Sequence, residues 1–461
     1  MMRQRSNVFS AACTIVLLSC LHPAGAFLQS RCTRSRCANH HLQSWKERRP
    51  ISNTSNCAPS KPSLDPSASA LHAVNFVSPL LESGYPPAVL EAEQCRDLGI
   101  SNPKPLLLYL PGFDGTLVAP FLQFPELGTI FEVRGMEVPM DDRSTFQQLR
   151  DTVVEHLASE GPDRPVFLMG ESFGGLLTVE VALELQSSTS TGRGSKATNL
   201  CGIVLVNPAT CYLRSSLADL GPKVAALPDW RYPIGVASLL PLFVDDFGLS
   251  QLLLILSSKA LPSVIDTPAR EAYMGRTAFS LPNKLKFMPK DTLCWRLEEW
   301  LTTGNTRING REDKMKRVLS SLPVLVLAGE EDRTLPAVDE AQRLQGILSD
   351  CSVHYVDGAG HAGTCGSRVD IAALMRNRFS LLRREKDAAT GGAVSSYPDG
   401  FMIAEGDNGR MSMKEEAASG KGEYFGMTAR YDGSVGLGLS PLKYWSHDLF
   451  RRWVSALPGA R

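Results

Sequence analysis

The stretch from Pro165 to Leu185 most restricts how this chain can fold. It reads as a short apolar strand, a Gly-Glu-Ser-Phe-Gly-Gly turn and an apolar-periodic helix. A Gly-x-Ser-x-Gly turn between a strand and a helix is typical of a nucleophile elbow, where a strained backbone lifts the serine hydroxyl above a sheet. Gly170 and Gly174 flank Ser172 at positions where a Cβ would collide with the strand or the helix. The stretch therefore predicts a nucleophilic Ser172 at the N-terminus of a helix, where negative charge is stabilised.

Continuous apolar strands alternate with helices on both sides of this turn. Strands that are apolar on both faces predict a mostly parallel sheet with helices on both of its faces, so the fold class is α/β. The site should then lie beyond the carboxyl ends of the strands. The expected strands are 106–110, 131–138, 166–169, 202–206, 322–327 and 353–356, and the expected helices are 146–158, 176–185, 337–348 and 369–382.

The alternation stops between Pro208 and Leu322. This insertion, about residues 209–320, is apolar but interrupted by Pro241, Asp245 and Asp246. We expect it to form a lid, and an apolar lid suits a greasy substrate; the alternative is a cap that only packs on the body. No uncharged stretch within it reaches the ~20 residues that a membrane-spanning helix needs.

Ser172 requires a base and an acid, because a hydroxyl is a poor nucleophile at neutral pH. His361 is the candidate base, since it lies in a glycine-rich loop directly after the last expected strand. Asp332 is the candidate acid, because a Gly-x-x-Asp-x-x-x-Pro pattern places it at the turn after the penultimate strand; Glu331 is the alternative. The chain order serine, acid, histidine is that of an α/β-hydrolase fold.

The oxyanion hole is expected from the backbone N–H groups of Phe113 and Phe173. Phe173 follows the nucleophile, and Phe113 lies in the loop after the strand at 106–110. Asp114 is expected to brace this loop, because a carboxylate acting beside a developing anion would be unfavourable.

These motifs together resemble the plastid esterase/lipase/thioesterase-like family that includes phytyl ester synthases with diacylglycerol acyltransferase activity. The resemblance implies an α/β-hydrolase fold with an inserted apolar lid. It also implies acyl transfer onto phytol or diacylglycerol from acyl-CoA, acyl carrier protein or galactolipid, on thylakoid lipid bodies. Family members carry a further acyltransferase domain with a His-x-x-x-x-Asp motif, and no such motif follows Glu385 here. The resemblance spans about residues 104–382 and rests on Leu-Pro-Gly-Phe-Asp-Gly-Thr (110–116), Gly-Glu-Ser-Phe-Gly-Gly (170–175), Asn-Pro-Ala-Thr (207–210) and Gly-His (360–361).

Both ends of the chain are predicted to lie outside the hydrolase domain. Residues 1–26 have the pattern of a signal peptide, and the serine-rich, basic residues 27–71 that of a transit peptide. Such a bipartite leader predicts import into the secondary plastid of an alga, with secretion as the alternative. We expect a linker at 72–103, the hydrolase domain at 104–385, a disordered tail at 386–443 and an amphipathic helix at 444–457 that lies on a membrane or docks on the body.

Composition limits the other classes of function. The 461 residues include 48 basic and 48 acidic side chains, a balance that does not favour nucleic acid as a partner. The 11 cysteines contain no Cys-x-x-Cys pair, so neither zinc nor a dithiol redox site is expected. No other metal or cofactor is expected, because the sequence has no metal-spaced His/Cys cluster and no phosphate-cradling Gly-rich loop with a lysine. The sequence predicts a serine-dependent acyl-ester hydrolase or acyltransferase for plastid lipids, with water or a lipid alcohol as acceptor and a peripheral membrane or lipid-body surface as a partner. A thioesterase on acyl-CoA or acyl carrier protein and a non-catalytic lipid-binding module are the alternatives.

Overall fold

The computed structural model describes most of the predicted hydrolase domain. The predicted leader at 1–71 and the predicted amphipathic helix at 444–457 lie outside the described residues. The described residues are 74–85, 104–121, 123–190, 198–243, 273, 287–365 and 369–382, with strands at 395–396, 401–405 and 411–415.

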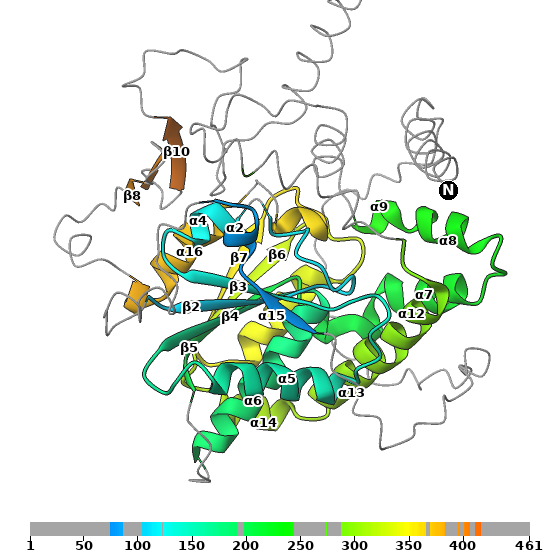
Figure 1. The fold of residues 1–461 in the computed structure, drawn as a ribbon, viewed down its shortest axis with the longest axis horizontal. Helices are drawn as coiled ribbons and strands as arrows, with labels where there is room; N and C mark the ends of the chain where they lie inside the picture. Colours follow the sequence, from blue (N-terminus) through cyan, green and yellow to red (C-terminus); the bar gives the residue numbers. More distant parts are fainter. Residues whose placement is uncertain are drawn as a thin grey trace, which may run out of the picture. The chain divides into compact units, whose positions relative to one another are not determined.

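A seven-stranded sheet forms the centre of the body (Figure 1). The strand order is β1-β3-β2-β4-β5-β6-β7; β1 runs antiparallel to β3, and the other described pairs of this sheet are parallel. The structure therefore confirms the mostly parallel sheet that the apolar strand pattern predicts. The strands are β1 (Asn75–Val77), β2 (Leu106–Leu110), β3 (Glu132–Glu137), β4 (Pro165–Glu171), β5 (Asn199–Val206), β6 (Val324–Gly329) and β7 (Cys351–Val356).

Strand β1 and helix α2 (Pro79–Glu82) correct the predicted domain boundary. Residues 72–103 are expected to be a linker, but Phe76 of β1 pairs with Met136 of β3, and Leu80 of α2 is buried in the core. A three-residue strand is too short to show the alternation by which strands are recognised. The hydrolase body therefore begins before residue 104.

Helices cover both faces of the sheet because its strands are apolar on both sides. Along β2, Leu108 packs into one core and Leu107 into the other. Helices α5 and α6 pack against each other over the first core (Figure 1). That face is covered by α5 (Phe146–Ala158), α6 (Phe173–Ser190) and α15 (Ala337–Ile347), and the other by α2, α4 (Phe124–Leu127) and α16 (Ile371–Arg378).

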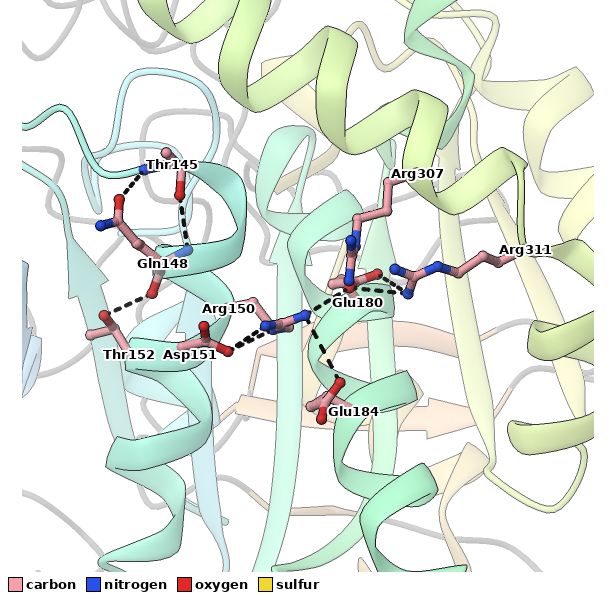
Figure 2. A network of polar contacts seen from close by, with 9 residues as sticks. All are labelled: Thr145, Gln148, Arg150, Asp151, Thr152, Glu180, Glu184, Arg307 and Arg311. Atoms are coloured by element: carbon pink, nitrogen blue, oxygen red, sulfur yellow. Dashed lines mark hydrogen bonds and ion pairs between the residues drawn. The ribbon is translucent and has the colours of Figure 1, made fainter.

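Helix α5 begins at the predicted residue because Thr145 caps it. The Thr145 hydroxyl accepts the Gln148 N–H at 3.2 Å, and the Gln148 side chain accepts the Thr145 N–H at 2.8 Å (Figure 2). This reciprocal capping box satisfies two N–H groups that a helix start leaves without partners.

The insertion between β5 and β6 forms a helical cap. Its return half includes a π-helix, η3 (Arg296–Thr302), which is a rare conformation. In the described part of the chain, no helix is long and apolar enough to cross a membrane. The other described cap elements are η2 (Ala209–Arg214), α7 (Ser216–Ala225), α8 (Tyr232–Ser238), α9 (Leu240–Phe243), α12 (Lys290–Trp295), α13 (Thr303–Asn309) and α14 (Glu312–Val318).

One buried carboxylate ties this return half to the body. Glu180 of α6 has a side chain that is 1% exposed and accepts Arg307 Nε at 2.7 Å. Arg311 Nη1 donates to both of its oxygens at 3.2 Å, and Arg150 of α5 donates at 3.3 Å (Figure 2). Because a buried charge that loses its partner is costly, this cluster fixes α13 and the residue before α14 to the helix that follows Ser172.

The tail is predicted to be disordered over 386–443, but its described residues form a separate three-stranded antiparallel sheet. Strands β9 (Phe401–Glu405) and β10 (Met411–Glu415) pair along their whole length, and β8 (Ser395–Ser396) pairs with β9. Strand β9 is apolar from Phe401 to Ala404, and Met411 and Met413 alternate with polar residues in β10, so both sequences suit extended pairing. The prediction of disorder is wrong for these strands.

Candidate active site

Ser172 lies between β4 and α6 in a conformation that few residues with a side chain adopt. Its φ is 54°, in the left-handed region. The Ser172 N–H donates to Val206 O at 2.9 Å, and its carbonyl accepts the Ala209 N–H at 2.8 Å. A Cβ on Gly170 would lie 2.2 Å from Gly174 O, and one on Gly174 would lie 2.0 Å from a carbonyl oxygen of β2. The turn therefore requires both glycines, and it has the strained backbone of a nucleophile elbow.

Asp332 and His361 meet beyond the ends of β6 and β7. Asp332 Oδ2 lies 2.7 Å from His361 Nδ1, and the two side chains are 1% and 5% exposed. The other carboxylate oxygen, Oδ1, accepts the N–H groups of Thr334 at 2.8 Å and Leu335 at 3.0 Å. These bonds orient the carboxylate toward the imidazole. Glu331, the alternative acid, is exposed to solvent.

Charge and burial act in opposite directions on His361. Burial lowers its pKa, but the Asp332 carboxylate, through charge and hydrogen bond, and the Glu171 carboxylate together raise the pKa above its ordinary value. Burial raises the pKa of Glu171 itself to about 7, although the Tyr109 hydroxyl donates to it at 2.6 Å. Two carboxylates thus favour the imidazolium form of His361.

Ser172 and His361 are linked through the end of β5. Among the described residues, no hydrogen bond joins Ser172 Oγ to the His361 ring. In free enzymes this contact is often long and tightens when substrate binds. The backbones of Ser172 and His361 bind two adjacent residues at the end of β5. Val206 O accepts the Ser172 N–H, and Asn207 Nδ2 donates to His361 O at 2.8 Å.

Asn207 is a residue whose role the sequence analysis does not predict. It is fully buried and has a φ of 41°. Besides its bond to His361, Nδ2 donates to Thr364 Oγ1 at 2.8 Å, and Oδ1 accepts the Gly329 N–H at 2.8 Å. Asn207 therefore connects the ends of β5 and β6 with the loop that carries His361. An Asn-Pro pair directly after an apolar strand is the signal that could have indicated it.

The predicted oxyanion residues both present backbone donors near Ser172. Phe173 is the first residue of α6, so its N–H has no acceptor within its own helix. In the described part of the chain, the Phe113 N–H donates to no protein group. The loop comes close to the nucleophile, because a Cβ on Gly112 would lie 3.8 Å from Ser172 Cβ. Asp114 accepts a hydrogen bond from the hydroxyl of Thr116, so it braces this loop as expected.

A strained serine beside two free N–H groups and a buried histidine–aspartate pair is an arrangement for covalent acyl transfer. Among the described residues, no group of three or more His, Cys, Asp or Glu side chains could hold a metal ion. A profile of the alpha/beta hydrolase family matches residues 107–367, which is more than half of the chain. The chain belongs to the α/β hydrolase family and is an enzyme of this class.

Within this family the chain is similar to two chloroplast proteins of Arabidopsis thaliana. It is 31% identical over 266 residues to phytyl ester synthase 1, covering 56% of this chain and 34% of that protein. It is 27% identical over 313 residues to phytyl ester synthase 2, covering 64% and 40%. The resemblance predicted from the motifs is confirmed over this part of the chain, which spans well under half of either relative.

Solved structures with similar folds include MenH from S. aureus and the carboxylesterase CesB from Bacillus subtilis. The first has 15% identity and a TM-score of 0.42, and the match covers 68% of this chain and 99% of that one. The second has 14% identity and a TM-score of 0.37, with coverage of 60% and 85%.

Proposed function

We propose that this chain is a serine-dependent acyl-ester hydrolase or acyltransferase that forms an acyl-enzyme on Ser172. The observation that carries the proposal is the buried contact of 2.7 Å between Asp332 and His361, at the edge of the sheet where Ser172 occupies its strained turn. A binding module has no need of an oriented, buried acid–base pair beside such a serine.

In the proposed reaction Ser172 Oγ attacks the acyl carbonyl carbon while His361 Nε2 takes the hydroxyl proton. Asp332 holds the imidazole tautomer and stabilises the imidazolium, and the N–H groups of Phe113 and Phe173 bind the oxyanion. When the tetrahedral intermediate collapses, the bond to the leaving alcohol breaks and His361 protonates that alcohol. Water or a second alcohol then attacks the acyl-enzyme, which releases an acid or a new ester and restores the free serine.

The proposed substrates are acyl esters of plastid lipids. The two relatives are named phytyl ester synthases and chloroplastic, which supports a lipid ester and a plastid location. The serine-rich basic leader supports the same location. The described cap is apolar beside the base: the Phe243 ring of α9 lies 6.1 Å from the His361 imidazole, edge to face. An apolar wall next to the base suits a long acyl or isoprenoid chain.

We further propose that the cap meets its insoluble substrate at a lipid surface. Tyr232 of α8 and Leu239, the residue after it, are buried, but an apolar stripe that runs from just before the helix along its other side is exposed. The stripe consists of Trp230, Pro233, Ile234 and Ala237, with Trp230 69% and Ile234 64% exposed. The Arg231 guanidinium lies 4.4 Å above the Trp230 ring, and a tryptophan with a basic neighbour is typical of interfacial contact. Because α9 follows α8 directly and contacts the base, a lipid bound here would lie near the site.

Labelling with a fluorophosphonate probe tests the proposed function. The full chain should react, and the Ser172→Ala variant should not. Acyl donors can then be compared with and without phytol, so that ester formation is distinguished from hydrolysis, and with thioester donors, so that a thioesterase is recognised. A folded wild-type chain that stays unlabelled in the presence of lipid micelles would refute the enzyme and favour a binding module.

A further inference from the structure

The π-helix η3 of the cap contacts both segments that supply the predicted oxyanion donors. Its first residue, Arg296, reaches the loop of Phe113, and its fifth, Trp300, reaches Phe173. π-turns are uncommon and occur frequently at functional sites. One turn of the cap therefore contacts two segments that are 60 residues apart in the chain.

Arg296 fastens the loop of Phe113. It is fully buried, and Nη1 donates to Phe113 O at 2.8 Å, while Nη2 donates to Pro139 O at 2.8 Å and to Val138 O at 3.3 Å. Burial lowers the pKa of Arg296 to about 10, against the opposing effect of Asp114, so the side chain stays charged at neutral pH. A buried guanidinium that binds three carbonyl oxygens leaves the loop little freedom to move.

The loop fastened in this way orients the Phe113 N–H. The Gly115 N–H donates to Gly112 O at 3.0 Å, and in a trans peptide the N–H of the next residue points opposite to that carbonyl. Gly115 has a φ of 74°, and a Cβ there would lie 2.5 Å from Val138 O and 3.1 Å from Arg296 Nη1. The turn, its glycine and the guanidinium therefore fit together as one unit.

Trp300 fixes Phe173 on the other side. The two rings are stacked with centroids 4.6 Å apart and planes within 17°, and the Phe146 ring lies edge-on to Phe173 at 6.1 Å. Trp300 is itself held, because its Nε1 donates to Ser144 O at 2.9 Å. The guanidinium of Arg296 lies 4.2 Å from the Trp300 ring centroid, so the two side chains support each other.

We propose that Arg296 and Trp300 are positioning residues that hold the Phe113 and Phe173 amides at the spacing required by a tetrahedral oxyanion. This inference rests on the proposed acyl-transfer function. It makes the return half of the cap a structural part of the oxyanion hole. The positive charge of Arg296 also offsets Asp114, the carboxylate that would otherwise oppose a developing anion in this loop.

The test compares matched oxygen esters and thionoesters in the full chain. Sulfur accepts hydrogen bonds poorly, so an oxyanion hole accelerates the oxygen ester far more than the thionoester. For Arg296→Gln and for Trp300→Leu we expect kcat on the oxygen ester to fall about ten- to a hundredfold, with KM changed less than about threefold. Thionoester kcat should fall much less, so the ratio of the two rates drops in both variants.

Arg307→Gln is the matched control. Arg307 also joins the cap to α6, but through Glu180, so its loss should lower stability and leave the oxygen-to-sulfur ratio unchanged. Arg296→Lys and Trp300→Phe are milder variants in case the first pair does not fold. An unchanged ratio in folded variants of an active wild type would overturn the inference alone. A wild type that fluorophosphonate does not label would overturn the proposed function and the inference with it.

Discussion

Replacement of Asn207 by glycine measures how firmly the histidine loop is held. Glycine adopts the φ of 41° without strain, but it loses the three hydrogen bonds of the side chain. At about 1 kcal/mol net for each bond, the loss of the three bonds should lower the free energy of unfolding by about 3 kcal/mol. The Gly329 N–H and the His361 carbonyl stay buried without the Asn207 side chain, which increases this loss. Asn207→Ala should cost about 1 kcal/mol more, since its Cβ occupies the left-handed region.

Denaturant unfolding gives the stabilities, and ester hydrolysis gives kcat. We expect kcat of Asn207→Gly to fall more than about tenfold, because a small shift of His361 misaligns the base. Asn305→Ala is the control: Asn305 is also buried, but it bonds to Ala209 at 3.0 Å and to Asn309 at 2.9 Å within the cap. The reasoning is refuted if Asn207→Gly costs no more stability than Asn305→Ala, or if it leaves kcat unchanged.

Three further changes have distinct signatures. Asp332→Asn should lower kcat about 10⁴-fold with little loss of fold, and the acid limb of kcat/KM should move to lower pH as the pKa of His361 falls. Glu171→Gln should shift that limb in the same direction by less. The folded pKa of Glu171 is raised to about 7, so the wild type loses stability as pH rises through that value. Unfolding at pH 8 should therefore show that the variant is the more stable protein. Trp230→Ser with Ile234→Ser should lower hydrolysis of emulsified lipid esters and leave a short soluble ester unaffected; equal loss on both would contradict the lipid-surface role.

The body of the fold was predictable because its signals are local. Strand β2 and helix α5 have the predicted bounds, since a continuous apolar run and a capped, periodic helix each appear within about a dozen residues. The glycine collisions at 170 and 174 were expected for the same reason. Asp332 could be preferred to Glu331 only from turn spacing, and the structure brings Asp332 to His361.

The contacts that complete the candidate site were not predictable in this way. Asn207 binds Gly329 and His361, which lie 122 and 154 residues further along the chain, so no window of sequence shows the connection. Arg296 lies in Arg-Leu-Glu-Glu-Trp-Leu-Thr, which resembles an ordinary amphipathic helix with its charges in solvent. Its complete burial depends on carbonyl oxygens near residues 113 and 139.

The strained turn at Ser172 has a consequence for when the serine becomes reactive. Its φ of 54° persists because Val206 and Ala209, on the next strand and the turn after it, bind the serine's own N–H and carbonyl. An unfolded chain contains the same hydroxyl but has neither the turn nor the donors beside it. The proposed mechanism therefore predicts that a newly made chain is inert toward esters until β4 and β5 have paired, and that reactivity appears together with the sheet.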